Sequence, residues 1–146
     1  MKLLLQRVSQ ASVAVAGQQV GAIDRGILAL VGFEREDTEA QVSRLTERML
    51  NYRLFADASG KTNLSVRDIA GGVLLVSQFT LAADTRRGLR PGFSLAAEPQ
   101  WAKHLYVTML EQLEKEAGVR VASGQFGAEM QVMLINDGPV TFLLEG

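Results

Sequence analysis

The run VSQFTL, at residues 76–81, places three hydrogen-bonding side chains where an apolar strand comes to its end. Ser77, Gln78 and Thr80 surround Phe79, and polar side chains at a strand end commonly form the wall of a pocket. A plain turn into a loop would have a similar composition. Taken alone, these four residues favour neither interpretation, so they stand as a candidate site.

A Gly-Pro pair, Gly138-Pro139, interrupts the apolar C-terminal run within the sequence NDGPVT. Proline fixes φ and removes a backbone donor, so the interior of a sheet avoids it. Asn, Asp, Gly and Pro are also the residues that turns prefer. On its own the stretch therefore favours a structural turn between two strands over a backbone shaped for function.

Three arginines, Arg86, Arg87 and Arg90, lie within five residues in the run TRRGLRPG. Glycine residues on both sides of Leu89 give this segment the conformational freedom of a loop. A charge run is usually only a solvated face. Because this one follows the polar strand end, it favours a contact with phosphate groups.

Several kinds of chemistry lack their residues in this sequence. The only histidine, His104, falls in the middle of a predicted helix, and cysteine is absent. A catalytic triad, a zinc site, a phosphate-binding loop and a dinucleotide fingerprint all lack the motifs that mark them. An enzyme with this sequence is expected to work without an imidazole base, a metal or another cofactor.

Composition points to one soluble globular domain spanning residues 1–146, with 47% hydrophobic and 21% charged residues. No apolar run reaches the ~18 residues of a membrane span, and the first is too short for a signal peptide. Lack of cysteine suits the cytosol. The net charge of −1 is unlike that of proteins that coat DNA, so any nucleic-acid contact is expected to be local.

Short runs rich in Val, Leu and Ile, punctuated by glycine, predict strands near the N-terminus. They fall at residues 2–8, 11–17, 18–23 and 26–33, with a hairpin turn at Gly17. A helix is predicted over 37–53, where Thr38 and Gln41 have capping-box spacing. A second is predicted over 98–118, with Pro99 in its first turn and Gly118 as its stop. A short strand and turn over 54–66, a strand beginning at residue 71 and two or three strands over 119–145 complete the pattern.

This order of elements predicts an α/β fold in a single domain. We expect mixed β-sheet layers, resembling a sandwich or barrel, with the helices packed on one face.

Four stretches taken together resemble the D-aminoacyl-tRNA deacylase family, also called D-tyrosyl-tRNA deacylase. They are VSQFTL at 76–81, RRGLRPGF at 86–93, GQFGAEMQV at 124–132 and NDGPVT at 136–141. Further similarity over residues 6–33 and 53–66 extends the resemblance to nearly the whole chain. It implies a cytoplasmic homodimer that hydrolyses the ester between a D-amino acid and the 3′-terminal ribose of tRNA.

The resemblance also implies a role for Gly138-Pro139. In the family this bond is cis, and one subunit inserts it into the active site of the other at the dimer interface. The neighbouring carbonyls would hold the substrate ammonium group, so an L-side chain would collide with rigid backbone. A D-side chain would point to open space. Glycine has no side chain to reject, so glycyl-tRNA is expected to be hydrolysed too.

The same resemblance assigns the remaining candidate residues. Ser77, Gln78, Phe79 and Thr80 would form the catalytic site, with backbone N–H groups stabilising the oxyanion. No base is visible to activate Thr80 as a nucleophile, so assistance from the vicinal ribose hydroxyl is favoured. The supporting residues would seat the terminal adenosine (Phe126, Met130), brace the Gly-Pro segment (Arg7) and contact tRNA phosphates (Arg86, Arg87, Arg90). Core packing is an equally good account of Phe126 and Met130.

Two other functions fit parts of the sequence. A non-catalytic tRNA- or RNA-binding domain of the same fold would keep the arginine loop, but it would not need both the SQFT and GPVT stretches. A general small-molecule esterase or amidase would need a base that the sequence lacks.

Overall fold

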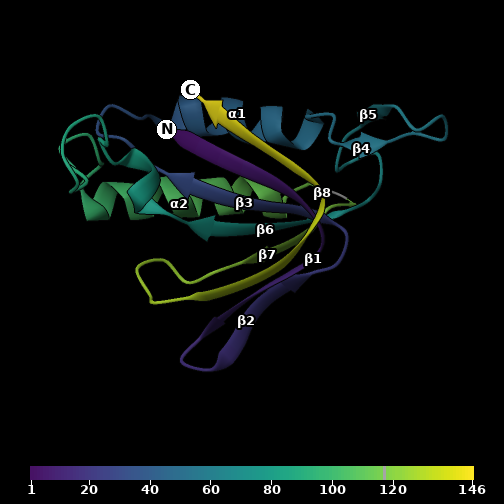
Figure 1. The fold of residues 1–146 in the computed structure, drawn as a ribbon, viewed down its shortest axis with the longest axis horizontal. Helices are drawn as coiled ribbons and strands as arrows, with labels where there is room; N and C mark the ends of the chain where they lie inside the picture. The colour runs from purple at the N-terminus through teal and green to yellow at the C-terminus, as the bar shows by residue number, and fades with distance from the viewer. Residues whose placement is uncertain (117) are drawn as a thin grey trace.

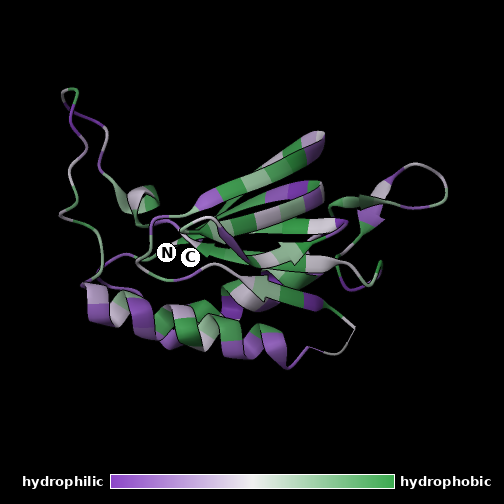
Figure 2. Cartoon of the chain, turned by 90° about the horizontal axis from the view of Figure 1, so that it is seen from below, coloured by the Kyte–Doolittle hydropathy of each residue, from purple (hydrophilic) through white to green (hydrophobic). Residues whose placement is uncertain are grey.

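The computed structural model of the chain describes residues 1–116 and 118–146. A six-stranded mixed sheet curls until it is nearly closed, and two helices lie together beneath one face of it (Figures 1 and 2). The predicted fold class is confirmed. Within the described residues, no helix is long and apolar enough to span a membrane.

The longest N-terminal element is β1, a single strand from Lys2 to Val15 where two were predicted. Its pairing explains the continuity, because one edge of β1 pairs with β3 (Gly26–Gly32) through its first half and with β2 (Gln18–Ile23) through its second. The hairpin turn between β1 and β2 is confirmed, with Gly17 at φ +78°.

The other edge of β1 pairs along almost its whole length with β8 (Gln131–Glu145). The predicted turn at Gly138-Pro139 is therefore wrong: the pair lies inside one long strand, where the β1–β8 register shifts. Here β8 is an edge strand, so the missing proline N–H breaks no ladder on its outer side. The Gly138-Pro139 bond is cis.

Beyond β3 the sheet becomes parallel, through β6 (Gly72–Ser77) and β7 (Arg120–Ser123). The sheet curls back so far that β7 approaches β2, and a Cβ on Gly21 would lie only 2.6 Å from the Ser123 carbonyl oxygen. Glycine at this position is what lets the two strands come so close.

Both faces of β3 and β6 are buried, as the apolar composition of β6 indicates. Val73 and Leu75 face the helices together with residues of β1, while Leu74 and Val76 face the inside of the curled sheet. The fold thus has two cores, one between sheet and helices and one within the curl. This burial fixes the end of β6, from which the SQFT stretch continues.

Helix α1 runs from Glu39 to Asn51, and the capping box of Thr38 and Gln41 is confirmed. Helix α2 runs from Pro99 to Glu114 and ends earlier than predicted, with Lys115 as its C-cap. Gly118 has φ +84° but lies beyond the helix. The part of that prediction at residue 117 lies outside the described residues. Between the helices, β4 (Phe55–Ala56) and β5 (Thr62–Leu64) form a small hairpin.

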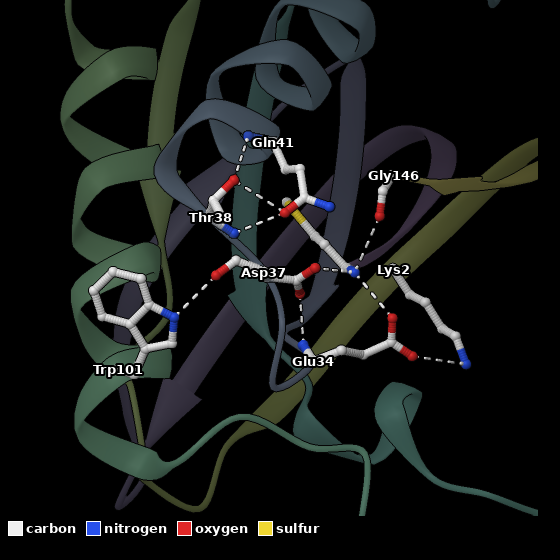
Figure 3. Close-up of polar contacts among 8 residues, drawn as sticks. Lys2, Glu34, Asp37, Thr38, Gln41, Trp101 and Gly146 are labelled. Atoms are coloured by element: carbon white, nitrogen blue, oxygen red, sulfur yellow. Dashed lines mark hydrogen bonds and ion pairs between the residues drawn. The ribbon is translucent and has the colours of Figure 1, made fainter.

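A buried ion-pair cluster joins β1 to the segment before α1 (Figure 3). The Met1 ammonium group donates to the Asp37 carboxylate at 2.5 Å and to the Glu34 carboxylate at 3.0 Å. The Trp101 indole of α2 donates to the Asp37 carbonyl oxygen at 3.0 Å. Asp37, at the residue before the N-cap of α1, thus connects the start of β1, the start of α1 and α2 at one point.

Candidate active site

A pocket of about 360 Å³ opens where β6 ends, between the sheet and the start of α2. Four of the residues predicted for the site, Ser77, Phe79, Phe126 and Met130, line it together. The rest of its wall is apolar: Val31, Phe33, Ala97, Pro99, Ala102, Gly127 and Ala128. Residues 77–79 and 126–130 are about fifty positions apart in the sequence, and the parallel pairing of β6 with β7 brings them to one edge of the sheet.

The SQFT stretch turns sharply as it leaves the sheet. The backbone N–H of Gln78 still donates to the Val31 carbonyl oxygen at 2.7 Å, and a 3₁₀ helix, η1, then runs from Phe79 to Ala82. Ser77 and Gln78 are half-buried, whereas Phe79 and Thr80 are exposed. Among the residues that the structure describes, the N–H groups of Phe79 and Thr80 have no acceptor. They are therefore available to a bound oxyanion.

Thr80 has an amide as its neighbour. The Gln78 Nε2 donates a short hydrogen bond to the Thr80 Oγ1. An amide N–H cannot take a proton from a hydroxyl, so this contact orients Thr80 without activating it. His104 is engaged elsewhere, 2.5 Å from the Glu39 carboxylate and stacked on Trp101.

Tyr106 of α2 supports the pocket from below. Its buried hydroxyl donates to the Leu75 carbonyl oxygen at 3.0 Å, and that oxygen also accepts from the N–H of Gly124 at 2.9 Å. The Tyr106 ring packs on Phe126, with centroids 5.6 Å apart. One side chain therefore contacts both chain segments that carry the pocket, just before Ser77 and just before Phe126. Burial raises the pKa of Tyr106 to about 12.

Phe126 and Met130 serve packing and pocket together. Both are half-buried; Phe126 packs against the core beneath the sheet and Met130 against the core inside the curl. The two alternatives left open by the sequence are thus compatible, because each side chain has one side in a core and another on the pocket wall.

Gly138-Pro139 lies away from the pocket of its own chain. It sits beside Arg7 of β1, whereas Ser77 is paired through Val31 to Leu3, on the opposite edge of that strand. From Gly138 to Ser77 the sheet is crossed by three strand spacings (β8 to β1 to β3 to β6) and by the four residues from Arg7 to Leu3. The separation is therefore about 20 Å along the sheet.

Arg7 holds the backbone next to Gly138. Its Nε donates to the Asp137 carbonyl oxygen at 2.8 Å, and its other end donates to the Leu54 carbonyl oxygen at 2.6 Å. The guanidinium group thereby ties the strand segment to the start of the β4–β5 hairpin.

The arginine loop projects from the body of the protein between η1 and α2 (Figures 1 and 2). Its base is closed by paired backbone hydrogen bonds between Asp84 and Gly92. Arg86 folds back onto the Asp84 carboxylate, and its hydrogen bonds hold the pKa of Asp84 well below the usual range. Arg87 and Arg90 are exposed and form no ion pair within the described part of the chain. The three arginines therefore have two different environments.

Comparison with known proteins fits this geometry. The family model for D-Tyr-tRNA(Tyr) deacylase matches residues 4–145. The chain belongs to that family. The D-aminoacyl-tRNA deacylase of Stutzerimonas stutzeri strain A1501 is 60% identical, and that of Pseudomonas putida strain W619 is 59% identical, each over 99% of both chains. The resemblance inferred from sequence is confirmed.

Two solved structures share the deacylase fold. One, named c-Myc DNA Unwinding Element Binding Protein, is 44% identical with a TM-score of 0.94, and the match covers 100% of this chain and 99% of that one. The other, a probable eukaryotic D-amino acid tRNA deacylase, has a TM-score of 0.85 over 98% and 97% of the two chains. At 16% identity the second likeness shows the fold alone.

Sequence reasoning missed two features of this candidate site. One is Tyr106, because the helical pattern over 98–118 does not show which backbone carbonyl group its hydroxyl reaches. The other is Phe93, whose ring lies 5.0 Å from that of Phe79. Within the described residues, no group of three or more acidic, His or Cys side chains could hold a metal ion.

The Tyr106 hydroxyl gives a measurable pH dependence. A tyrosine unfolds into water with a pKa of about 10, and the folded pKa is higher, so its contribution to stability is complete below pH 10 and is lost as the pH rises toward 12. By pH 11 the loss should be about 1.4 kcal/mol. We expect the free energy of unfolding of wild type, measured in urea at pH 8 and pH 11, to fall more than that of Tyr106→Phe. All other titrating groups are common to both proteins, so parallel pH curves would contradict the role of the hydroxyl.

Proposed function

We propose that this protein hydrolyses the ester bond of D-aminoacyl-tRNA, releasing the D-amino acid and free tRNA. The observation that carries the proposal is the pocket in which Ser77, Phe79, Phe126 and Met130 meet, in a chain of the deacylase family. A strand end with free N–H groups supplies an oxyanion site, and the apolar wall supplies room for a nucleoside.

In the proposed reaction, water adds to the ester carbonyl and the ribose oxygen leaves as a hydroxyl. The N–H groups of Phe79 and Thr80 face the oxyanion, while Ser77 and Gln78 position the ester. A base is still needed, and Thr80 has only an amide beside it. The hydroxyl next to the ester on the same ribose is close enough to assist the attack, so the substrate supplies the group that the protein lacks.

Phe126 and Met130 would seat the terminal adenosine. An aromatic ring and a thioether on one apolar wall suit the face of a purine, since stacking and dispersion need flat, polarisable surfaces. The packing of Phe126 on Tyr106 keeps the ring in place.

Gly138-Pro139 would act as the chiral filter. Rigid main chain, braced by Arg7 on the carbonyl oxygen of Asp137, cannot move aside for an L-side chain. Rejection by collision is a common means of specificity. A glycyl ester has nothing to collide and would pass the filter.

The filter would come from a second copy of the chain. In one chain, the SQFT stretch and Gly138-Pro139 lie too far apart to act on the same ester. The strand that carries Gly138-Pro139 is an edge strand with exposed apolar side chains: Met133, Ile135, Phe142 and Leu143. Exposed edge strands of this composition are prone to pair or pack with another chain. A homodimer with the active site at the interface accounts for both observations.

Arg87 and Arg90 are the proposed phosphate contacts, with Arg86 shaping the loop through Asp84. We propose RNA, and not DNA, as the nucleic-acid partner, because the proposed substrate is an ester of tRNA. The net charge of −1 argues only against coating a long duplex of either kind. Cytoplasmic location follows from the proposed substrate. The non-catalytic RNA-binding alternative leaves the free N–H groups at the SQFT stretch without a role.

The decisive assay compares D-Tyr-tRNA, L-Tyr-tRNA and Gly-tRNA with a catalytic amount of protein. We expect rapid release from the D-ester and the glycyl ester, with the L-ester spared. Hydrolysis of both enantiomers would leave an esterase without the filter assigned to Gly138-Pro139. Folded protein that turns over none of the three substrates would refute the enzyme.

Thr80→Ala separates a nucleophile from a positioning residue. We expect a fall in kcat of roughly tenfold or less, because loss of a nucleophile typically costs on the order of 10⁴-fold or more. A D-aminoacyl-tRNA ending in 2′-deoxyadenosine should lose roughly 100-fold or more with wild type. Full activity on the deoxy substrate together with a dead Thr80→Ala variant would assign the chemistry to the threonine.

Ile135→Asp tests the homodimer. A charge on the exposed apolar face of β8 should give a monomer by size-exclusion chromatography with light scattering, and hydrolysis of D-Tyr-tRNA should fall with it. Val107→Asp, at a similarly exposed position on α2 (42% against 53% exposed), is the matched control. A monomeric wild type with full activity and an intact filter would refute the shared site.

A further inference from the structure

Phe79 and Phe93 form an aromatic pair on the surface. Their ring centroids are 5.0 Å apart at an interplanar angle of 40°, and their exposed fractions are 62% and 38%. Large aromatic side chains are usually mostly buried. Two that contact each other and still remain open to solvent form a surface suited to a flat ligand.

The pair lies between the pocket and the arginine loop. Phe79 lines the pocket, so the aromatic surface is continuous with the proposed adenosine seat. Phe93 directly follows the Asp84–Gly92 bridge that closes the base of the loop. A turn in which the Ala96 N–H donates to the Phe93 carbonyl oxygen at 3.1 Å fixes its backbone on the other side. The position of Phe93 is therefore determined by the base of the loop and not by its exposed tip.

Positive charge lies on the same loop. Arg86 is neutralised by Asp84, whereas Arg87 and Arg90 are exposed and without an ion pair among the described residues. An aromatic surface at the base of a loop that also carries guanidinium groups is a combination that single-stranded nucleic acid binds, through bases on rings and phosphates on charges.

We propose that Phe79 and Phe93 form a stacking subsite for the nucleobase immediately 5′ of the terminal adenosine. This subsite rests on the proposed function and extends it from the terminal nucleoside to the single-stranded 3′ end. With the adenosine against Phe126 and Met130, the next nucleotide leaves the pocket over Phe79. Its phosphate then heads toward Arg87 and Arg90.

The proposal makes Phe93 a residue that recognises the RNA without touching the ester. Stacking of one base on an aromatic side chain is typically lost on alanine substitution at a cost equivalent to roughly 5- to 150-fold in affinity. A D-tyrosyl ester of adenosine alone lacks the second base. It should therefore be indifferent to Phe93.

Binding is measured with two non-hydrolysable probes in which an amide replaces the ester: D-tyrosylamino-adenosine and the same group at the 3′ end of the trinucleotide CCA. We expect Phe93→Ala to weaken binding of the trinucleotide roughly tenfold or more and to leave the adenosine probe unchanged. Phe93→Tyr should keep wild-type affinity for both. Leu95→Ala, an exposed apolar residue of the same segment (46% exposed), is the control that should change neither.

The outcomes separate this subsite from the proposed reaction. If wild type hydrolyses no D-ester, but Phe93→Ala weakens binding of the trinucleotide and not of the adenosine probe, the reaction would be refuted and the subsite kept. Active enzyme in which Phe93→Ala binds both probes like wild type, or weakens both equally, would overturn the subsite. Dissociation of the Phe93→Ala variant into monomers would also overturn it, because Phe93 would then be a subunit contact.

Discussion

Pairing of β1 along both of its edges is the interaction on which the rest of the structure depends. One edge joins it to β3, and through β3 to the parallel strands that carry the pocket; the other joins it to β8, which carries Gly138-Pro139. Strand β1 thus holds the SQFT stretch and Gly138-Pro139 in place and keeps them apart. If both the SQFT stretch and Gly138-Pro139 act on one ester, as we propose, a second copy of the chain would supply one of them, because pairing with β1 holds the two stretches apart within one chain.

The pocket itself is positioned by backbone pairing and by one tyrosine. Parallel strands end at the same edge of a sheet, so β6 and β7 deliver residues 77–79 and 126–130 to a common wall. Tyr106 then fixes both segments from beneath, by its hydroxyl on Leu75 and its ring on Phe126. The pocket wall is mostly apolar. The groups that can donate hydrogen bonds to a bound oxyanion are the main-chain N–H groups of Phe79 and Thr80. Backbone N–H groups do not change their protonation with pH, and they are present whatever side chain the residue carries.

The candidate site contains few side chains that could act as a base or a nucleophile. The single histidine is held by Glu39 on the helix layer, and the threonine of the SQFT stretch receives a hydrogen bond from an amide. Neither can generate a strong nucleophile. In the proposed reaction, the ribose hydroxyl beside the ester takes over this role. The protein would then position the ester, exclude L-side chains and bind the RNA end. In our proposals, Phe79 and Phe93 would bind the RNA end through its bases, and Arg87 and Arg90 would bind it through its phosphates.

The sequence by itself determined what depends on local interactions. The capping box of Thr38 and Gln41, the hairpin at Gly17 and the strand buried on both faces all arise from residues close together in the chain, and all are present. The motifs that identify the family are equally local. Tertiary structure alone decided the rest. Residues 2–15 form one strand because β2 and β3 both pair with one edge of β1. Gly138-Pro139 lies within a strand because β8 pairs with β1 both before and after this pair of residues. Helix α2 ends at Glu114 although its stop residue comes later, and Phe93 meets Phe79 only through the closed base of a loop. The reason is physical: propensity and periodicity act over a few residues, whereas strand partners and ring contacts are chosen by segments far away in the chain.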